Sequence, residues 1–324
     1  MTQRIQGAHA TMSVPRRVFV TGATGVVGRH VVPLLLASGS RVTAVGRTVE
    51  ARARLESMGA TAVPLDLFDG AAARRALEEH DAVINLATHM PASALWMMLP
   101  WSWRENDRVR RDASATLVDA ALDVGVSRFV QESFAPVYED GGERSIDETW
   151  PQRPTSYNRT VLDAERSAMR FTERGGGAGV VLRFAGFYGP DPFLRDMIGV
   201  ARRGWSPLPG APEAYWSSVA HEDAATAAVA ALGVSAGAYN VCDDEPLTRR
   251  GWLDALAAAL GGLPRAPRTM PGWLGKLGGP VVALLARSQR MSNAKLKAAT
   301  GGGWAPRWPS AREGLCEAVR ALEG

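Results

Sequence analysis

The chain has 324 residues, of which 37 are basic and 33 acidic, so its formal net charge is +4. The basic residues are scattered, and no Lys/Arg run or interleaved aromatic stripe indicates a nucleic-acid surface. Cys242 and Cys316 are the only cysteines, which excludes a disulfide framework and a cysteine-rich metal centre. We therefore expect no nucleic-acid partner and no metal ion.

We expect no targeting or membrane segment at residues 1–14 or in the most apolar late stretch of the sequence. Residues 1–14 are polar and lack the apolar core of a signal peptide, so we expect a disordered leader. The most apolar late stretch, residues 270–286, contains a lysine, two prolines and four glycines and is short for a membrane span. These features favour a cytoplasmic protein with no membrane partner.

The first predicted element is a strand at 18–21, which stops at a glycine turn and restarts as a helix at 29–38. Glycines at 22, 25 and 28 let the backbone turn tightly and present bare N–H groups to a diphosphate, which the helix dipole also favours. A strand before the glycines and a helix after them is the context that a dinucleotide site requires. The predicted cofactor loop is Thr21, Gly22, Ala23, Thr24, Gly25, Val26, Val27 and Gly28.

Strand-like and helix-like segments then alternate, as in a parallel sheet wrapped by helices. Strands are predicted at 41–45, 61–64, 82–86, 128–131, 179–184 and 238–241, and helices at 51–58, 71–79, 104–124, 157–174, 220–232 and 250–260. Proline and tryptophan become frequent after Gly186, which indicates loops over a pocket. We expect an α/β fold, a Rossmann-type doubly wound parallel sheet at 15–185 and 216–242, with a smaller, interleaved substrate-binding lobe at 186–215 and 243–324.

From Arg16 onward the order of these signals resembles the extended short-chain dehydrogenase/reductase superfamily, in its epimerase/dehydratase and atypical reductase branches. The matching segments are TGATGVVG at 21–28 and those at 65–67, 85–88, 182–190, 218–225, 239–241 and 292–315. The resemblance implies that Asp66 and Leu67 contact the adenine of a nicotinamide dinucleotide. It also implies that Leu86, Ala87 and Thr88 pass along the same cofactor.

The end of the second predicted strand bears on the choice of cofactor. NAD enzymes usually place a carboxylate there, which binds the ribose 2′-hydroxyl. In this chain Val45 is followed by Gly46 and Arg47, and a guanidinium can bind the 2′-phosphate of NADP through two hydrogen bonds. We therefore expect NADP rather than NAD, although Arg47 could also be an ordinary solvated loop residue.

The resemblance implies a catalytic Tyr, a Lys four residues later and a Ser or Thr at the end of the preceding strand. Tyr157 matches the tyrosine, as proton donor and as a cofactor contact, but Val161 stands where the lysine belongs. Phe134 occupies the Ser/Thr place, and Ser133 is offset by one residue, which turns a strand side chain to the other face. Two of the three catalytic groups are therefore missing or displaced.

Three functions stay open on this pattern. The first is an NADP-dependent oxidoreductase that reduces a carbonyl or activated double bond of a small apolar metabolite, with Tyr157 assisted by Arg159 or a water. The second is a non-redox reaction on the same fold: a cyclisation, elimination or isomerisation. The third is a catalytically inert NADP-sensing protein, and Tyr157 could itself be a core tyrosine.

Residues 89–103 contain three tryptophans and three methionines, which can line an adaptable apolar cavity. The predicted substrate pocket comprises Trp96, Trp101, Phe134, Phe187 and Trp216, and an apolar or aromatic metabolite suits it better than a nucleotide sugar. Ordinary packing or a dimer contact would also explain these aromatic residues. The predicted helices at 104–124 and 157–174 are rich in small residues, and the resemblance implies a homodimer through them.

Overall fold

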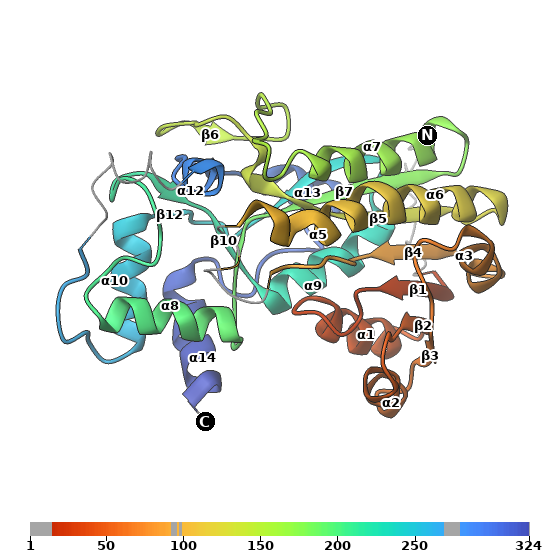
Figure 1. Cartoon of the computed structure of the whole chain (residues 1–324), viewed down its shortest axis with the longest axis horizontal. Helices are drawn as coiled ribbons and strands as arrows, with labels where there is room; N and C mark the ends of the chain where they lie inside the picture. Colours follow the sequence, from red (N-terminus) through yellow and green to blue (C-terminus); the bar gives the residue numbers. More distant parts are fainter. Residues whose placement is uncertain (1–14, 92–95, 97–98, 269–278, 324) are drawn as a thin grey trace, which may run out of the picture.

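The computed structural model describes residues 15–91, 96, 99–268 and 279–323 (Figure 1). The expected leader at 1–14 lies outside the described residues. A seven-stranded sheet in the order β11-β7-β5-β4-β1-β2-β3 forms the centre, and all its neighbouring strands are parallel. Its strands are β1 (Arg17–Thr21), β2 (Arg41–Val45), β3 (Thr61–Val63), β4 (Ala82–Asn85), β5 (Arg128–Phe134), β7 (Ala178–Phe184) and β11 (Gly237–Val241).

Helices cover both faces of this sheet, and a separate buried apolar cluster lies on each face. One face carries α1 (Gly28–Ala37) and α9 (His221–Ala230), which pack on each other and on the sheet. The other carries α3 (Gly70–Leu77), α6 (Ser114–Asp123) and α7 (Thr160–Glu173). Helix α2 (Val49–Ser57) connects β2 with β3. The Rossmann-type α/β fold predicted from the sequence is confirmed.

A third apolar cluster lies beside the sheet, among α8 (Pro192–Arg202), α10 (Arg249–Ala259) and α14 (Ala311–Glu323) (Figure 1). Short strand pairs connect this region to the sheet: β8 (Gly186–Tyr188) with β10 (Ser218–Ala220), β9 (Tyr215–Trp216) with β12 (Leu247–Thr248), and β6 (Ser145–Ile146) with β13 (Arg290–Met291). Helices α12 (Gly279–Leu285) and α13 (Ala294–Ala299) precede and follow β13. The division of the chain into a cofactor domain and a substrate lobe stays a prediction.

Three element boundaries differ from the sequence-based expectation, and each affects the site. The helix predicted at 104–124 is interrupted: a 3₁₀ turn (Pro100–Trp103) and α5 (Arg104–Arg108) lead into a π-helical turn (Val109–Ala113) before α6. The fifth strand continues to Phe134, three residues beyond its predicted end. Helix α7 begins at Thr160, so Tyr157 lies in the turn before it rather than on the helix.

The small residues that suggested a dimer interface are mostly buried inside the single chain. The residues concerned, each at most 5% exposed, are Ala113, Ala120, Ala121, Ala164 and Ala168. They pack against the sheet and neighbouring helices, whereas Ala115, the remaining member of this set, is only partly buried. The homodimer stays a prediction that light scattering at micromolar concentration can test.

The structure also bears on membranes and metals. In the ranges it describes, no helix is long and apolar enough to cross a membrane. The same ranges contain no group of three or more His, Cys, Asp or Glu side chains arranged to hold a metal ion.

Candidate active site

A groove of about 830 Å³ runs along the carboxyl ends of β1, β2 and β4. In open parallel α/β sheets this is the edge where ligands bind. Most of the residues predicted to contact a cofactor lie in its wall, together with others from the same loops. The lining includes Gly22, Thr24, Gly25, Arg47, Asp66, Leu67, Leu86, Ala87 and Thr88.

Glycine is required at two positions of the loop between β1 and α1. Gly22 has a φ of +64°, and a Cβ there would lie 2.3 Å from the carbonyl oxygen of Leu86. A Cβ at Gly28 would lie 2.2 Å from the carbonyl oxygen of Gly22. Helix α1 begins directly after this turn with no described side chain capping its first turn, so its N-terminus is available to an anion. The groove and this glycine turn fit the diphosphate of a nicotinamide dinucleotide.

Three residues of the predicted cofactor loop are buried beneath the groove: Thr21, Ala23 and Val27. The hydroxyl of Thr21 donates to Oδ1 of Asn85 on β4 at 2.5 Å. The amide nitrogen of Asn85 donates in turn to Oε1 of Gln131 on β5 at 2.8 Å. This chain of hydrogen bonds holds the ends of three adjacent strands together under the loop.

Arg47 is exposed at the far end of the groove, where the sequence predicts a 2′-phosphate contact. Arg52 organises the backbone at this point, because its Nη1 donates to the carbonyl oxygen of Gly46 at 3.1 Å and to that of Arg47 at 3.4 Å. In the loop after β3, Oδ1 of Asp66 accepts from the backbone N–H of Phe68 at 3.0 Å. The loops that line this end of the groove are therefore fixed by local hydrogen bonds.

A second cavity, of about 140 Å³, continues inward from the groove and shares Gly22, Gly25, Leu86 and Thr88 with it. Five aromatic side chains and two charged residues lie in its wall. The deeper lining comprises Val26, Val27, Met90, Trp103, Arg110, Glu132, Phe134, Tyr157, Phe184 and Phe187. We call this space the inner cavity.

Tyr157 lies in the wall of the inner cavity and packs edge-to-face on Trp103, with ring centroids 4.2 Å apart. Burial raises the pKa of the Tyr157 hydroxyl well above its usual value, while the nearby Arg110 guanidinium acts to lower this pKa. Arg159, the helper suggested from the sequence, is exposed on the turn before α7. The cation that acts on Tyr157 is therefore Arg110.

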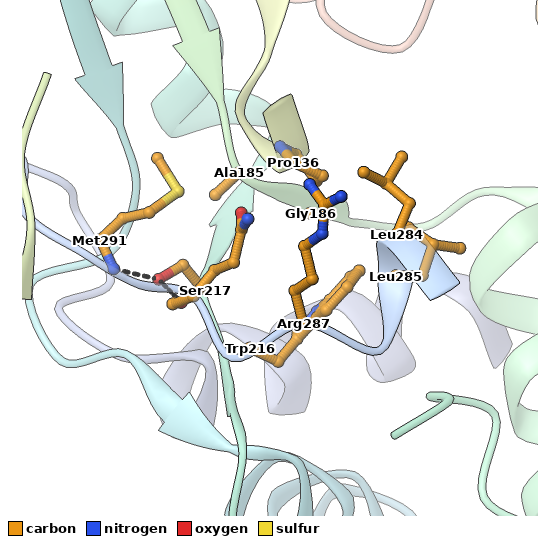
Figure 2. Close-up of a pocket in the computed structure, with 10 residues that line it drawn as sticks. Pro136, Ala185, Gly186, Trp216, Ser217, Leu284, Leu285, Arg287 and Met291 are labelled. Atoms are coloured by element: carbon orange, nitrogen blue, oxygen red, sulfur yellow. Dashed lines mark hydrogen bonds between the residues drawn. The ribbon is translucent and has the colours of Figure 1, made fainter. Parts of the chain in front are cut away.

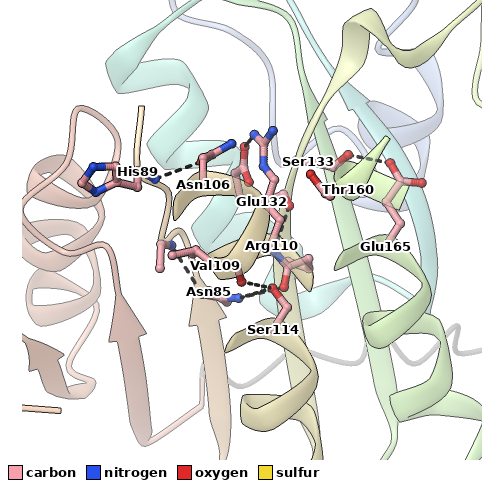
Figure 3. A network of polar contacts seen from close by, with 12 residues as sticks. Asn85, His89, Asn106, Val109, Arg110, Ser114, Glu132, Ser133, Thr160 and Glu165 are labelled. Carbon is pink, nitrogen blue, oxygen red and sulfur yellow. Dashed lines mark hydrogen bonds and ion pairs between the residues drawn. The ribbon is translucent and has the colours of Figure 1, made fainter. Parts of the chain in front are cut away.

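Arg110 belongs to the π-helical turn and forms a buried ion pair with Glu132 at the end of β5, with Nη2 and Oε1 2.9 Å apart. Figure 3 shows the two side chains meeting in front of the sheet. π-Helical turns often occur at functional sites, because the extra residue shifts the side chains that follow. Sequence reasoning missed both residues, since a π turn has no sequence signature and the fifth strand was expected to end before Glu132.

The comparisons with known proteins agree with this geometry. Residues 18–242 match the model of the NAD dependent epimerase/dehydratase family. The chain belongs to that family. It is 33% identical over 313 residues to a 3-diazoavenalumate denitrifying reductase of a Streptomyces species, which covers 92% of this chain and 99% of the relative. It is 26% identical over 295 residues to a 2-alkyl-3-oxoalkanoate reductase of Shewanella oneidensis, covering 82% of this chain and 71% of the relative.

Among solved structures, a Thermus thermophilus UDP-glucose 4-epimerase in complex with NAD superposes with a TM-score of 0.74 at 27% identity. The match covers 95% of this chain and 99% of that one. Together with the reductase relatives, it makes the chain a short-chain dehydrogenase/reductase-type oxidoreductase with a site for a nicotinamide dinucleotide.

Within this family the chain departs from the usual catalytic set. Val161 is fully buried in the apolar core, where a lysine amine would have no place. The Ser133 hydroxyl points away from the inner cavity and donates to Oε1 of Glu165 at 2.5 Å (Figure 3). Strand alternation instead turns Glu132 and Phe134 toward the cavity. Of the three expected groups, Tyr157 alone reaches this space.

The tryptophans chosen from the sequence do not line the inner cavity, whereas Trp103 does. Trp96 and Trp101 are 52% and 56% exposed, while Trp103 is only 3% exposed. Trp216 lines a different cavity of about 10 Å³, next to Leu284, Leu285 and Arg287 (Figure 2). Its ring packs on Gly186, where a Cβ would lie 2.5 Å from Trp216 Cζ2, and so it cannot wall the space that Phe187 faces.

Proposed function

We propose that this protein is an NADPH-dependent reductase that transfers a hydride to a carbonyl or activated double bond of a small aromatic or apolar metabolite. The inner cavity carries the proposal, because five aromatic side chains surround a space that opens onto the cofactor groove. An apolar cavity of about 150 Å³ is just large enough to bind benzene, so a cavity of about 140 Å³ is too small for a nucleotide sugar.

NADPH rather than NADH is proposed because of the charge at the end of β2. Arg47 lines the groove there, and the next two residues, Thr48 and Val49, bring no carboxylate to the position of a ribose hydroxyl. Arg52 keeps the loop backbone in place through its bonds to Gly46 and Arg47. The exposed Arg47 guanidinium is then free to bind a phosphate.

The bound nicotinamide supplies the hydride, and the chain supplies position, a dry environment and a proton. Gly22 and Gly28 permit the close approach of the diphosphate, and Asp66 and Leu67 flank the adenine end. Trp103, Phe134 and Phe187 exclude water from the reacting atoms. Tyr157 lines this cavity, and its hydroxyl can donate a proton to an oxygen that becomes negative during reduction.

A second hydride acceptor has specific support. The relative that matches over its full length is named as denitrifying a diazo compound. When an aryl diazonium is reduced, a C–H bond replaces the C–N bond, whose electron pair leaves with N₂, and no proton is needed. A site without the lysine and serine of a proton-donating apparatus suits such an acceptor. Both acceptors use the same cofactor site and cavity.

The test is NADPH consumption, followed by its absorbance, with acetophenone, benzylideneacetone and benzenediazonium as acceptors. Reactions without enzyme correct for the intrinsic reactivity of the diazonium. NADPH deuterated at its hydride position should pass deuterium to the product carbon. Product formed without NADPH consumption would favour a non-redox reaction, and tight NADPH binding with no product from any acceptor would favour a sensing role.

A further inference from the structure

Arg110 and Glu132, which line the inner cavity, each carry a buried polar atom without a partner among the described residues: Arg110 Nε and Glu132 Oε2. A third such atom, Nδ2 of Asn106, belongs to a residue outside the cavity lining. Asn106 on α5 and Arg110 in the π turn that follows are four residues apart and therefore share a helix face. Oδ1 of Asn106 accepts from the backbone N–H of His89 at 2.9 Å, which fixes its amide. Figure 3 shows Asn106 next to the Arg110–Glu132 pair.

Buried polar atoms are almost always hydrogen-bonded, and an unpaired one costs about 1–3 kcal/mol. All three residues are more than 90% buried, so bulk water does not satisfy these atoms. Nη2 of Arg110 and Oε1 of Glu132 form the ion pair, so Nε remains as a donor and Oε2 as an acceptor. The charges of the two side chains cancel. This arrangement matches a ligand group that accepts from an N–H and donates to a carboxylate oxygen.

We propose that Arg110, Glu132 and Asn106 form the polar anchor of the substrate site and bind an un-ionised hydroxyl on the substrate ring. A hydroxyl has one O–H donor and two acceptor lone pairs. It can therefore donate to Oε2 of Glu132 and accept from the N–H groups of Arg110 and Asn106. The inference rests on the proposed function, because it places a ring in the inner cavity. A carboxylate is excluded from this position, since it would face Glu132 with like charge and leave Oε2 without a donor.

The test compares three probes that share one ring and differ in one substituent: 3-hydroxyacetophenone, acetophenone and 3-acetylbenzoate. Dissociation constants are measured by calorimetry with NADP⁺-saturated protein at about pH 6.5, where a phenol of ordinary pKa near 10 is un-ionised. We expect the hydroxyl probe to bind at least about tenfold more tightly than acetophenone, the value of one hydrogen bond to a charged group. The carboxylate probe should bind most weakly.

Two variants separate anchoring from folding. Glu132→Gln keeps the shape of the side chain but replaces one carboxylate oxygen by a donor, so the preference for the hydroxyl probe should fall to less than about threefold. Glu165→Gln is the matched control, because Glu165 belongs to a buried ion pair with Arg183 that does not line the cavity. This control should keep the full preference, whatever happens to its melting temperature.

Binding and turnover give independent answers. Equal affinity for the three probes in the wild type, or an unchanged preference in Glu132→Gln, would overturn the anchor and indicate that a trapped water satisfies these atoms. A clear preference without NADPH oxidation would leave the anchor in place and count against the proposed reductase activity.

Discussion

Tyr157 packs edge-to-face against Trp103, with ring centroids 4.2 Å apart and ring planes at 75°. Trp103 ends the 3₁₀ turn that leads into α5, and Tyr157 precedes α7. The contact therefore joins two segments that are far apart in the sequence at the wall of the inner cavity. It holds the tyrosine ring by packing, in a site that lacks the lysine amine of related enzymes.

Replacing the Tyr157 hydroxyl distinguishes the two proposed hydride acceptors. Tyr157→Phe should lower kcat for acetophenone by about 10²–10⁴-fold, the usual contribution of a positioned general acid. The same variant should leave the rate with benzenediazonium almost unchanged, because that reduction needs no proton. Steady-state kinetics on both substrates provide the measurement. Undiminished ketone turnover in Tyr157→Phe would exclude the tyrosine as proton donor.

The pH profile of ketone reduction gives a second view of Tyr157. Burial raises the pKa of this hydroxyl, so the neutral, proton-donating form persists above the usual value near 10. We therefore expect no decline of kcat from tyrosine ionisation between about pH 7 and 10. A decline with an apparent pKa of 8 or 9 that disappears in Tyr157→Phe would contradict this prediction.

Removing the Arg47 guanidinium should weaken NADPH binding selectively. A charge-assisted hydrogen bond contributes about 1.5–3 kcal/mol, so Arg47→Ala should raise the Kd of NADPH at least about tenfold and leave that of NADH unchanged. Arg54→Ala is the matched control, because Arg54 is exposed on α2 and does not line the groove. Equal affinity of the wild type for NADPH and NADH by calorimetry would refute the cofactor assignment.

A comparison of Gly22 with Gly39 distinguishes the cost of a left-handed backbone from the cost of a steric clash. Gly22 and Gly39 have φ values of +64° and +87°, but only Gly22 has backbone atoms where a Cβ would lie, at 2.3 Å. Gly39→Ala should therefore cost about 1–2 kcal/mol, the penalty of the left-handed conformation. Gly22→Ala should cost more and also abolish cofactor binding. Thermal unfolding with and without NADPH measures both effects, and similar losses in the two variants would contradict the steric argument.

The parts of the molecule governed by local sequence rules were predictable. The spacing of Gly22, Gly25 and Gly28 predicted the tight turn between β1 and α1, because turn geometry acts within a few residues. The displacement of Ser133 also followed from strand alternation, and the structure shows its hydroxyl on Glu165. Both conclusions depend on short-range geometry that one sequence contains.

The parts that depend on tertiary packing were not predictable. Arg110 lies at the cavity because it belongs to a π turn. In the sequence, an arginine within a predicted amphipathic helix is instead expected to be exposed to solvent. The choice among Trp96, Trp101 and Trp103 depends on how a 3₁₀ turn docks on the turn before α7, which composition does not encode. Trp216 was misplaced for the same reason, since its packing partner Gly186 lies on a neighbouring strand.

The last prediction concerns acid stability and His221. This side chain at the start of α9 is 2% exposed, with Nδ1 3.4 Å from Arg29 Nη2 and Nε2 3.4 Å from Asp191 Oδ2. Burial, followed by the charges of Arg29 and His30, lowers its pKa from 6.5 to about 3. Below pH 6.5 the unfolded chain therefore binds a proton that the folded chain excludes.

Stability should consequently fall as pH decreases from 6.5 toward 3, by at most about 1.4 kcal/mol per pH unit from this group. The raised pKa of Asp191, caused by burial, acts in the opposite sense and makes the observed slope smaller. His221→Gln removes the titrating group, so its melting temperature should decline less than that of the wild type between pH 6.5 and 4. His80→Gln is the comparison, because His80 is only half buried and its pKa is lowered mainly by that burial. If both variants keep the wild-type slope, His221 does not control acid stability and another buried group must carry it.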